Sequence, residues 1–159
     1  MLRVGCSIFI ERSFSMRCIG IIWNSAFRYR KEMVEIISRY AMSISRQFEI
    51  NLKNQYNEFV REIYKSEDME NWKIESKISH MENNLNKKVY IVFFEIDSKV
   101  QYYHAKKKKY VYINLQELKD LLRNLYKEKI DNYFFDIIFH CTENDKEFCK
   151  CKEIIEKYT

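Results

Sequence analysis

The strongest strand signal in this sequence is Lys88-Val89-Tyr90-Ile91-Val92-Phe93-Phe94-Glu95-Ile96. The stretch is rich in β-branched and aromatic residues, which favour strands, and its side chains are apolar on both faces of the expected strand. Strands of this kind are buried between other elements of a fold. We therefore expect residues 88–96 to form a central strand.

On either side of this strand, the spacing of the apolar residues changes from one segment to the next. Residues 17–23 are a continuous apolar run, and residues 42–52 alternate apolar and polar side chains as a half-buried strand does. Elsewhere the apolar residues recur at helical spacing. The spacing predicts further strands over 17–23, 42–52 and 133–139, a short extended segment over 110–113, and helices over 27–41, 54–67, 68–82, 115–126 and 143–158.

The order of these elements indicates an α+β fold. It approximates a β-α-β-β-α-β split unit with additional helices. We predict a ferredoxin-like α/β sandwich, in which an antiparallel sheet of about four strands has its helices packed on one face. The alternative is a doubly wound parallel sheet, but the sequence lacks the glycine-rich turn that binds a dinucleotide or a phosphate in such folds.

Length and composition indicate one folded domain. The chain has 159 residues, and its content of 47% hydrophobic and 16% aromatic residues is too high for a disordered chain. Residues 16–159 are expected to form this domain. Residues 1–15 are expected to be an N-terminal appendage or the result of an upstream start, because a second methionine, Met16, precedes the first convincing strand.

The cysteines and the N-terminal segment bear on the location of the protein. The five cysteines are odd in number and irregularly spaced, so we expect no disulfide framework and a reducing, cytoplasmic location. The apolar stretch 2–10 is too short to span a bilayer. Cys149-Lys150-Cys151 lacks the second ligand pair of a structural zinc site, and we predict no metal site in the protein.

His140 is the first candidate for chemistry. It follows the apolar segment 133–139 and precedes Cys141-Thr142-Glu143-Asn144-Asp145, which has the composition of a turn. Its ring is expected at the end of the sheet beside a helix N-terminus, where free N–H groups suit a phosphate. An imidazole there can act as a nucleophile or move a proton. The alternative is that His140 has no chemical task and that Thr142 begins a capping box.

A run of four lysines is the second candidate. Lys106, Lys107, Lys108 and Lys109 lie among His104 and four tyrosines, in a chain of net charge +5. Lysines interleaved with aromatic residues can hold nucleic acid or the phosphates of a small ligand. They can equally form a solvated hairpin tip, and we regard that alternative as the more common one.

Several segments together resemble nucleoside diphosphate kinases. The resemblance lies in the strand Ile19-Gly20-Ile21-Ile22-Trp23-Asn24-Ser25-Ala26 and in Glu35-Ile36-Ile37-Ser38-Arg39-Tyr40, Phe59-Val60-Arg61-Glu62-Ile63-Tyr64, Leu121-Leu122-Arg123-Asn124-Leu125, Ile137-Ile138-Phe139-His140-Cys141-Thr142-Glu143 and Glu153-Ile154. It extends over nearly the whole chain from residue 17. The Ile-Trp strand end and the His-Xaa-Thr turn also resemble bacterial proteins linked to surface-sugar synthesis.

The resemblance implies a role for each matching residue. His140 would accept a phosphoryl group, Glu153 would orient its imidazole, and Arg123 and Thr142 would contact phosphate. Trp23 stands at the position of the phosphate-binding lysine of the family, so ordinary nucleoside diphosphate kinase activity is not expected. Mg²⁺ would accompany nucleotide phosphates, and an oligomer is consistent with such a family.

The sequence therefore leads to a main hypothesis and two alternatives. The main hypothesis is a divergent phosphate-handling enzyme that transfers a phosphoryl group through a histidine, on a nucleotide, nucleotide-sugar or sugar phosphate. The first alternative is a catalytically silent ligand-binding or scaffold domain of the same fold. The second is a small RNA-binding or nuclease-type protein.

Overall fold

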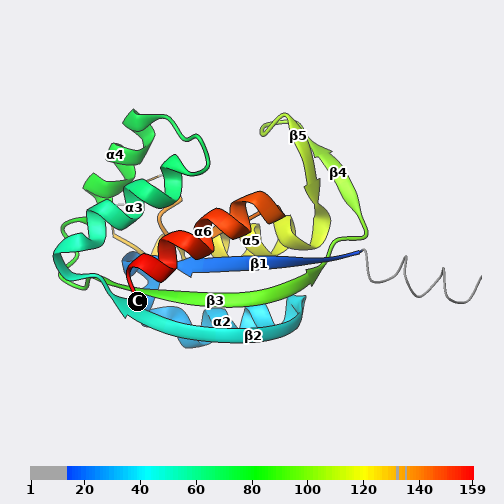
Figure 1. Ribbon diagram of the computed structural model, residues 1–159, viewed down its shortest axis with the longest axis horizontal. Helices are drawn as coiled ribbons and strands as arrows, with labels where there is room; N and C mark the ends of the chain where they lie inside the picture. The colour runs from blue at the N-terminus through cyan, green and yellow to red at the C-terminus, as the bar shows by residue number, and fades with distance from the viewer. Residues whose placement is uncertain (1–13, 132, 135) are drawn as a thin grey trace, which may run out of the picture.

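The sheet predicted from the sequence is present in the computed structural model, which describes residues 14–131, 133–134 and 136–159. Its four strands run antiparallel in the order β2-β3-β1-β6 (Figure 1). Their bounds are Ser15–Ile22 for β1, Ala41–Asn51 for β2, Lys88–Asp97 for β3 and Phe139–Cys141 for β6. The strand expected to be central, β3, lies between β2 and β1 and pairs with both.

The remaining elements are helices, short 3-10 segments and a separate hairpin. The α-helices are α2 (Arg30–Tyr40), α3 (Tyr56–Lys65), α4 (Asn71–Met81), α5 (Ile113–Tyr126) and α6 (Asp145–Lys157). The 3-10 segments are η1 (Asn24–Tyr29), η2 (Lys53–Gln55) and η3 (Lys127–Lys129). The hairpin consists of β4 (Gln101–His104) and β5 (Lys109–Tyr112).

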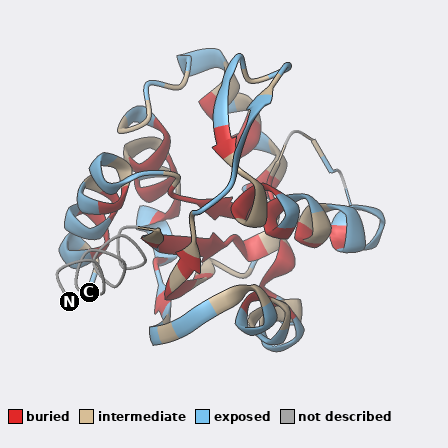
Figure 2. Cartoon of the chain, turned by 90° about the vertical axis from the view of Figure 1, so that its right-hand side faces the viewer, coloured by how far each residue is buried: buried red, intermediate tan, exposed pale blue. Residues whose placement is uncertain are grey.

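Helices cover both faces of the sheet, whereas the sequence analysis expected them on one. Ile19, Ile21 and Ile91 pack against α3, α4 and α6 in one buried cluster, and Cys18 and Val92 pack against α2 and α5 in another. Figure 2 shows the buried residues concentrated in the strands and on the inner sides of the helices. The physical reason is that β1 and β3 are apolar on both faces, so both faces must be shielded from water.

The last strand is shorter than predicted. The apolar segment 133–139 was expected to be extended, but β6 contains Phe139–Cys141 only. Oδ1 of Asp136 accepts hydrogen bonds from the backbone N–H groups of Ile138, at 3.2 Å, and Phe139, at 3.3 Å, and this holds a turn before β6. Ile137 and Ile138 are fully buried without being in a strand, which explains why their apolar pattern resembled one.

The edge strand β2 departs from the strict alternation of its sequence. Its pairing with β3 shifts register between Ala41 and Ser43 and again between Ile44 and Arg46. Within the strand, Ile50 alone is buried. The two shifts rotate successive side chains out of phase, so the alternation in sequence does not become an alternation in burial.

Two parts of the chain rise from the same side of the sheet. The α3–α4 pair and the β4–β5 hairpin project upward in Figure 1, at opposite ends of the molecule. The Lys106–Lys109 run lies at the turn of this hairpin, where Lys108 has a φ of 55°. Among the described residues, no helix is long and apolar enough to cross a membrane.

Candidate functional site

A cavity of about 430 Å³ opens between the two projecting parts. Residues from α3, α4, the hairpin, α5 and the end of β6 line it, so it forms only when segments distant in sequence meet. His140 is among the lining residues. Its cationic side chains outnumber its acidic ones, and the cations are Lys77, Lys107, Lys109, Lys119 and Arg123.

His140 lies in β6 opposite Ile21 of β1. Its ring packs edge-on against Tyr64, with 5.2 Å between centroids, and beside Trp23 at 6.4 Å. Its Nε2 is enclosed and lies 2.5 Å from Oε2 of Glu67, an ion-pair contact whose angles are outside those of a regular hydrogen bond. Within the described residues, nothing is hydrogen-bonded to Nδ1 of this largely buried ring.

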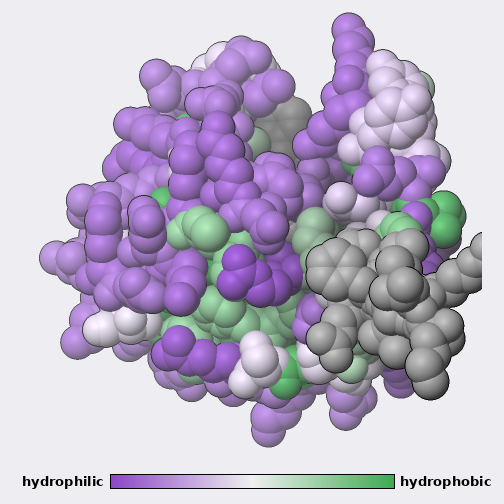
Figure 3. Space-filling model, turned by 45° about the vertical axis from the view of Figure 1, so that its right-hand side comes forward, coloured by the Kyte–Doolittle hydropathy of each residue, from purple (hydrophilic) through white to green (hydrophobic). Residues whose placement is uncertain are grey.

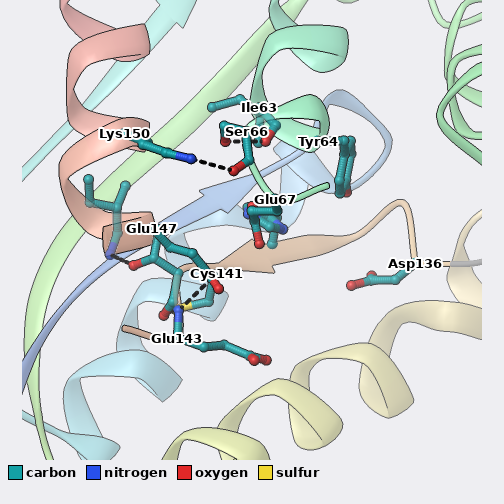
Figure 4. Close-up of polar contacts among 12 residues, drawn as sticks. Ile63, Tyr64, Ser66, Glu67, Asp136, Cys141, Glu143, Glu147 and Lys150 are labelled. Carbon is teal, nitrogen blue, oxygen red and sulfur yellow. Dashed lines mark hydrogen bonds and ion pairs between the residues drawn. The ribbon is translucent and has the colours of Figure 1, made fainter. Parts of the chain in front are cut away.

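Glu67 provides the carboxylate that the resemblance had assigned to Glu153. Figure 4 shows Glu67 between the end of α3 and strand β6. Burial raises the pKa of Glu67, but the charge of His140 and its contact offset this, and the pKa lies below its usual value. Glu153 is exposed on α6, and the structure does not bring it to His140.

Glu143 is surrounded by lysines. Its Oε1 lies 3.0 Å from Nζ of Lys107 and in close contact with Nζ of Lys119, and its Oε2 lies 2.6 Å from Nζ of Lys109. Burial raises the pKa of Glu143, but the three ammonium groups hold it well below its usual range. The carboxylate is therefore permanently ionised at neutral pH.

Arg123, for which the resemblance implied a phosphate contact, lines the cavity. Its Nη2 forms a close ion pair with Oδ2 of Asp136 and donates to the carbonyl oxygen of Phe139 at 3.4 Å. Lys77 donates to the carbonyl oxygen of Asp136 at 2.7 Å. Burial, together with the charge of Arg123, lowers the pKa of Lys77 to about 8, although Asp136 opposes the shift. Two cations from different helices thus meet at the turn before His140.

Thr142 and Trp23 lie outside the cavity. Thr142 is fully buried, and its Oγ1 accepts a hydrogen bond from the N–H of Ile19 at 2.9 Å. Trp23 is also fully buried, and its Nε1 donates to the hydroxyl of Tyr64 at 3.1 Å. Both polar groups are used to hold the sheet and the core, so the structure does not place either beside a ligand in the cavity.

The N-cap of α6 is Asn144, two residues after Thr142, the cap considered from the sequence. The side chain of Asn144 accepts a hydrogen bond from the N–H of Glu147 at 2.8 Å, which makes Asn144 the N-cap. Oε1 of Glu147 in turn accepts from the N–H of Glu143 at 3.0 Å. The helix N-terminus is thus already capped by its own side chains.

The four-lysine run divides into two pairs. Lys107 and Lys109 contact Glu143 and line the cavity, although Lys109 is itself exposed, whereas Lys106 and Lys108 do not line the cavity. Figure 3 shows hydrophilic side chains crowding the upper part of the molecule, where the hairpin projects. Half of the run therefore lines the same cavity as His140, a proximity that the sequence does not reveal.

Two lysines of the cavity, Lys119 and Lys77, were not predicted, although the sequence carried a signal for them. Lys119 falls on the apolar stripe formed by Leu115, Leu118 and Leu122, and Lys77 falls on the corresponding stripe of α4. Both are almost completely buried. A lysine on the buried stripe of a helix must pair with a buried acid or face a polar cavity, because an unpaired buried charge is costly.

Comparison with known proteins supports the fold. No protein-family model matches the chain, and no curated protein matches it in sequence. A solved structure, the orthorhombic crystal form C222 of the Aquifex aeolicus nucleoside diphosphate kinase, is similar to it, with a TM-score of 0.54. The two chains share a fold. The identity is 11%, and the similarity covers 89% of this chain and 94% of the other, which confirms the predicted ferredoxin-like sandwich of the nucleoside diphosphate kinase type.

Proposed function

We propose that the cavity beside His140 binds the phosphate group of a small phosphorylated molecule. The observation that carries this proposal is the excess of cations over acids around one histidine. A phosphate group has a charge of about −1.5 to −2 at pH 7 and three acceptor oxygens, which suits a site of this kind. The similarity of the fold to a nucleoside diphosphate kinase is consistent with phosphate chemistry but does not identify the ligand.

We further propose that His140 accepts a phosphoryl group. The lone pair of Nδ1 would form a bond to phosphorus, while the bond from phosphorus to the leaving oxygen breaks and its electrons remain with that oxygen. Nε2 would keep its proton, and the neighbouring carboxylate of Glu67 would balance the positive charge that develops on the ring. Arg123 would contact the oxygens of the transferred group.

The proposal is tested by incubating the protein with a γ-labelled nucleoside triphosphate and locating the label by mass spectrometry. We expect label on His140 in the wild type and none in His140→Asn. His80→Asn is a matched control, because His80 lies on α4 and does not line the cavity. Nucleotide-sugars and sugar phosphates are compared in a thermal-shift screen, since a bound ligand raises the melting temperature.

The outcomes separate an enzyme from a silent binding domain. A thermal shift without label supports the catalytically silent domain of the same fold. The absence of label, together with equal ligand shifts in the wild type and His140→Asn, would contradict both proposed roles of the histidine.

The residues present do not form a magnesium site. Each acidic side chain of the cavity, Glu67, Asp136 and Glu143, already contacts a basic side chain. Within the described ranges there is no group of three or more metal-ligating side chains. We therefore assign no step to a protein-bound Mg²⁺.

A second candidate function rests on the outer surface of the hairpin. Tyr103 and Tyr110 are exposed and pack edge-on, with 5.5 Å between ring centroids, near the exposed Lys106 and Lys108. Exposed aromatic rings and lysines together can bind single-stranded RNA. Salt-dependent RNA binding that weakens in the double variant Lys106→Gln, Lys108→Gln, and not in His140→Asn, would support this function instead.

A further inference from the structure

Three lysines from two separate elements share one carboxylate. Lys107 and Lys109 come from the hairpin and Lys119 from α5, and all three contact Glu143 as described above. Lys107 also donates to Oε1 of Gln116 at 2.8 Å. The three ammonium groups therefore surround the carboxylate of Glu143.

The charges around this carboxylate do not balance. Of the described acids, Glu143 is the one in direct contact with the three ammonium groups, and Glu67 and Glu147 act on Lys109 from farther away. The side chain of Lys119 is only 6% exposed, so water screens the repulsion among the lysines poorly. A phosphate group offers about two negative charges and a third oxygen, and it would match three ammonium groups better than a carboxylate does.

A second cavity lies beside the Glu143 side chain. The residue stands between the cavity and a smaller one of about 230 Å³, and it lines both together with Lys109. The smaller cavity is bounded by the hairpin and by Asn144 at the start of α6. Rotation of the Glu143 side chain toward the smaller cavity would carry its carboxylate away from Lys107 and Lys119, which do not line that cavity, and would leave it near Lys109.

We propose that Lys107, Lys109 and Lys119 form an oxyanion site that Glu143 occupies in the free protein, and that the phosphate group of a ligand displaces the Glu143 carboxylate. The Glu143 carboxylate then competes with the ligand for the three lysines and lowers the affinity of the site for anions. The inference rests on the proposed function in that the ligand carries phosphate, but it does not require transfer to His140.

The test is calorimetric binding of inorganic pyrophosphate at constant ionic strength. Glu143→Gln keeps the shape of the side chain and removes its charge, and we expect it to bind pyrophosphate about tenfold more tightly than the wild type, within the usual range of coupling between sites. Glu153→Gln is the matched control, because it removes an exposed glutamate of α6. It should bind as the wild type does.

Lysine variants test the other half of the site. Lys119→Met and Lys107→Met should weaken binding of pyrophosphate, whereas Lys108→Met, in the same run but exposed, should not. If Glu143→Gln does not fold, as judged by circular dichroism, Glu143→Asp replaces it. The shorter side chain reaches the lysines less well and should also bind the anion more tightly.

The results distinguish this inference from the proposed function. Tighter binding in Glu143→Gln without label on His140 supports the inference and contradicts phosphoryl transfer. Label on His140 with unchanged or weaker binding in Glu143→Gln overturns the inference alone. The absence of pyrophosphate binding in both the wild type and Glu143→Gln overturns the inference and the proposed phosphate site together.

Discussion

The whole side chain of Trp23 is buried in the core beside His140. Its indole packs at 5.7 Å from the ring of Tyr64 and edge-on against Phe59 at 6.1 Å, and its N–H is hydrogen-bonded to the Tyr64 hydroxyl. The position that resembles a phosphate-binding lysine is thus occupied by a packing residue. A side chain with no exposed surface supports the shape of the cavity without entering it.

Substitutions at Trp23 are expected to change stability rather than anion binding. Trp23→Ala should lower the free energy of unfolding by about 3–5 kcal/mol, because it empties a large buried volume. Trp23→Phe retains most of the packing and should bind pyrophosphate with the affinity of the wild type. Urea denaturation and calorimetry measure the two quantities. A loss of affinity in a stably folded Trp23→Phe would return Trp23 to the set of phosphate contacts.

At the scale of single elements, the contact between β1 and β6 depends on a glycine. A Cβ atom added at Gly20 would lie 2.8 Å from Cε1 and Cζ of the Phe139 ring. Gly20 pairs with Cys141, beside His140, so this close approach fixes the position of the strand that carries the histidine. A larger residue at position 20 would require the Phe139 ring to move.

Gly20→Ala is therefore expected to destabilise the protein by about 1–3 kcal/mol, the usual cost of overpacking. The double variant Gly20→Ala, Phe139→Leu removes the obstructing ring and should lose less stability than the two single substitutions added together. Thermal and urea unfolding of the four proteins give the coupling energy. Additive losses would show that the ring does not obstruct the new methyl group.

Local patterns in the sequence were sufficient for most elements, but they placed His140 after the last strand, whereas it lies within β6. The strand signals of residues 17–23 and 88–96 and the helical stripes depend on neighbours along the chain, and the elements appear where the patterns predicted them. The partners of His140 could not be predicted in this way. Glu67 reaches it from another element, and the closeness of the two depends on how α3 packs over the sheet.

The sequence also could not show which lysines belong to the site. Four consecutive lysines have the same local pattern, and only the position of the hairpin beside Glu143 distinguishes Lys107 and Lys109 from the other two. The burial of Lys119 was readable from its helical stripe, but its partner Glu143 was not. Contacts between residues of different elements are thus harder to predict from the sequence than the elements themselves.

At the scale of the whole molecule, the site should bind anions less well as the solution becomes more basic. Burial, with the charge of Lys119, lowers the pKa of Lys107 to about 8, and burial lowers that of Lys77 to about 8. An anion favours the protonated form of each lysine, so affinity is highest below this pKa and falls above it.

Sulfate is a suitable probe because its charge does not change in this range. We expect its affinity to fall between about pH 7 and pH 9, and to fall less steeply in Lys107→Met, which lacks one of the titrating groups. Calorimetry at constant ionic strength measures the slope. An equal slope in the wild type and Lys107→Met would mean that Lys107 does not take part in anion binding.

The two carboxylate oxygens of Asp136 have different partners. Oδ1 holds the turn before β6, and Oδ2 holds the guanidinium of Arg123. If Arg123 turned to a ligand, Oδ2 of Asp136 and the carbonyl oxygen of Phe139 would both lose their partner, while Oδ1 of Asp136 would still hold the turn before β6. The turn that precedes the histidine is therefore held by hydrogen bonds that do not depend on the guanidinium.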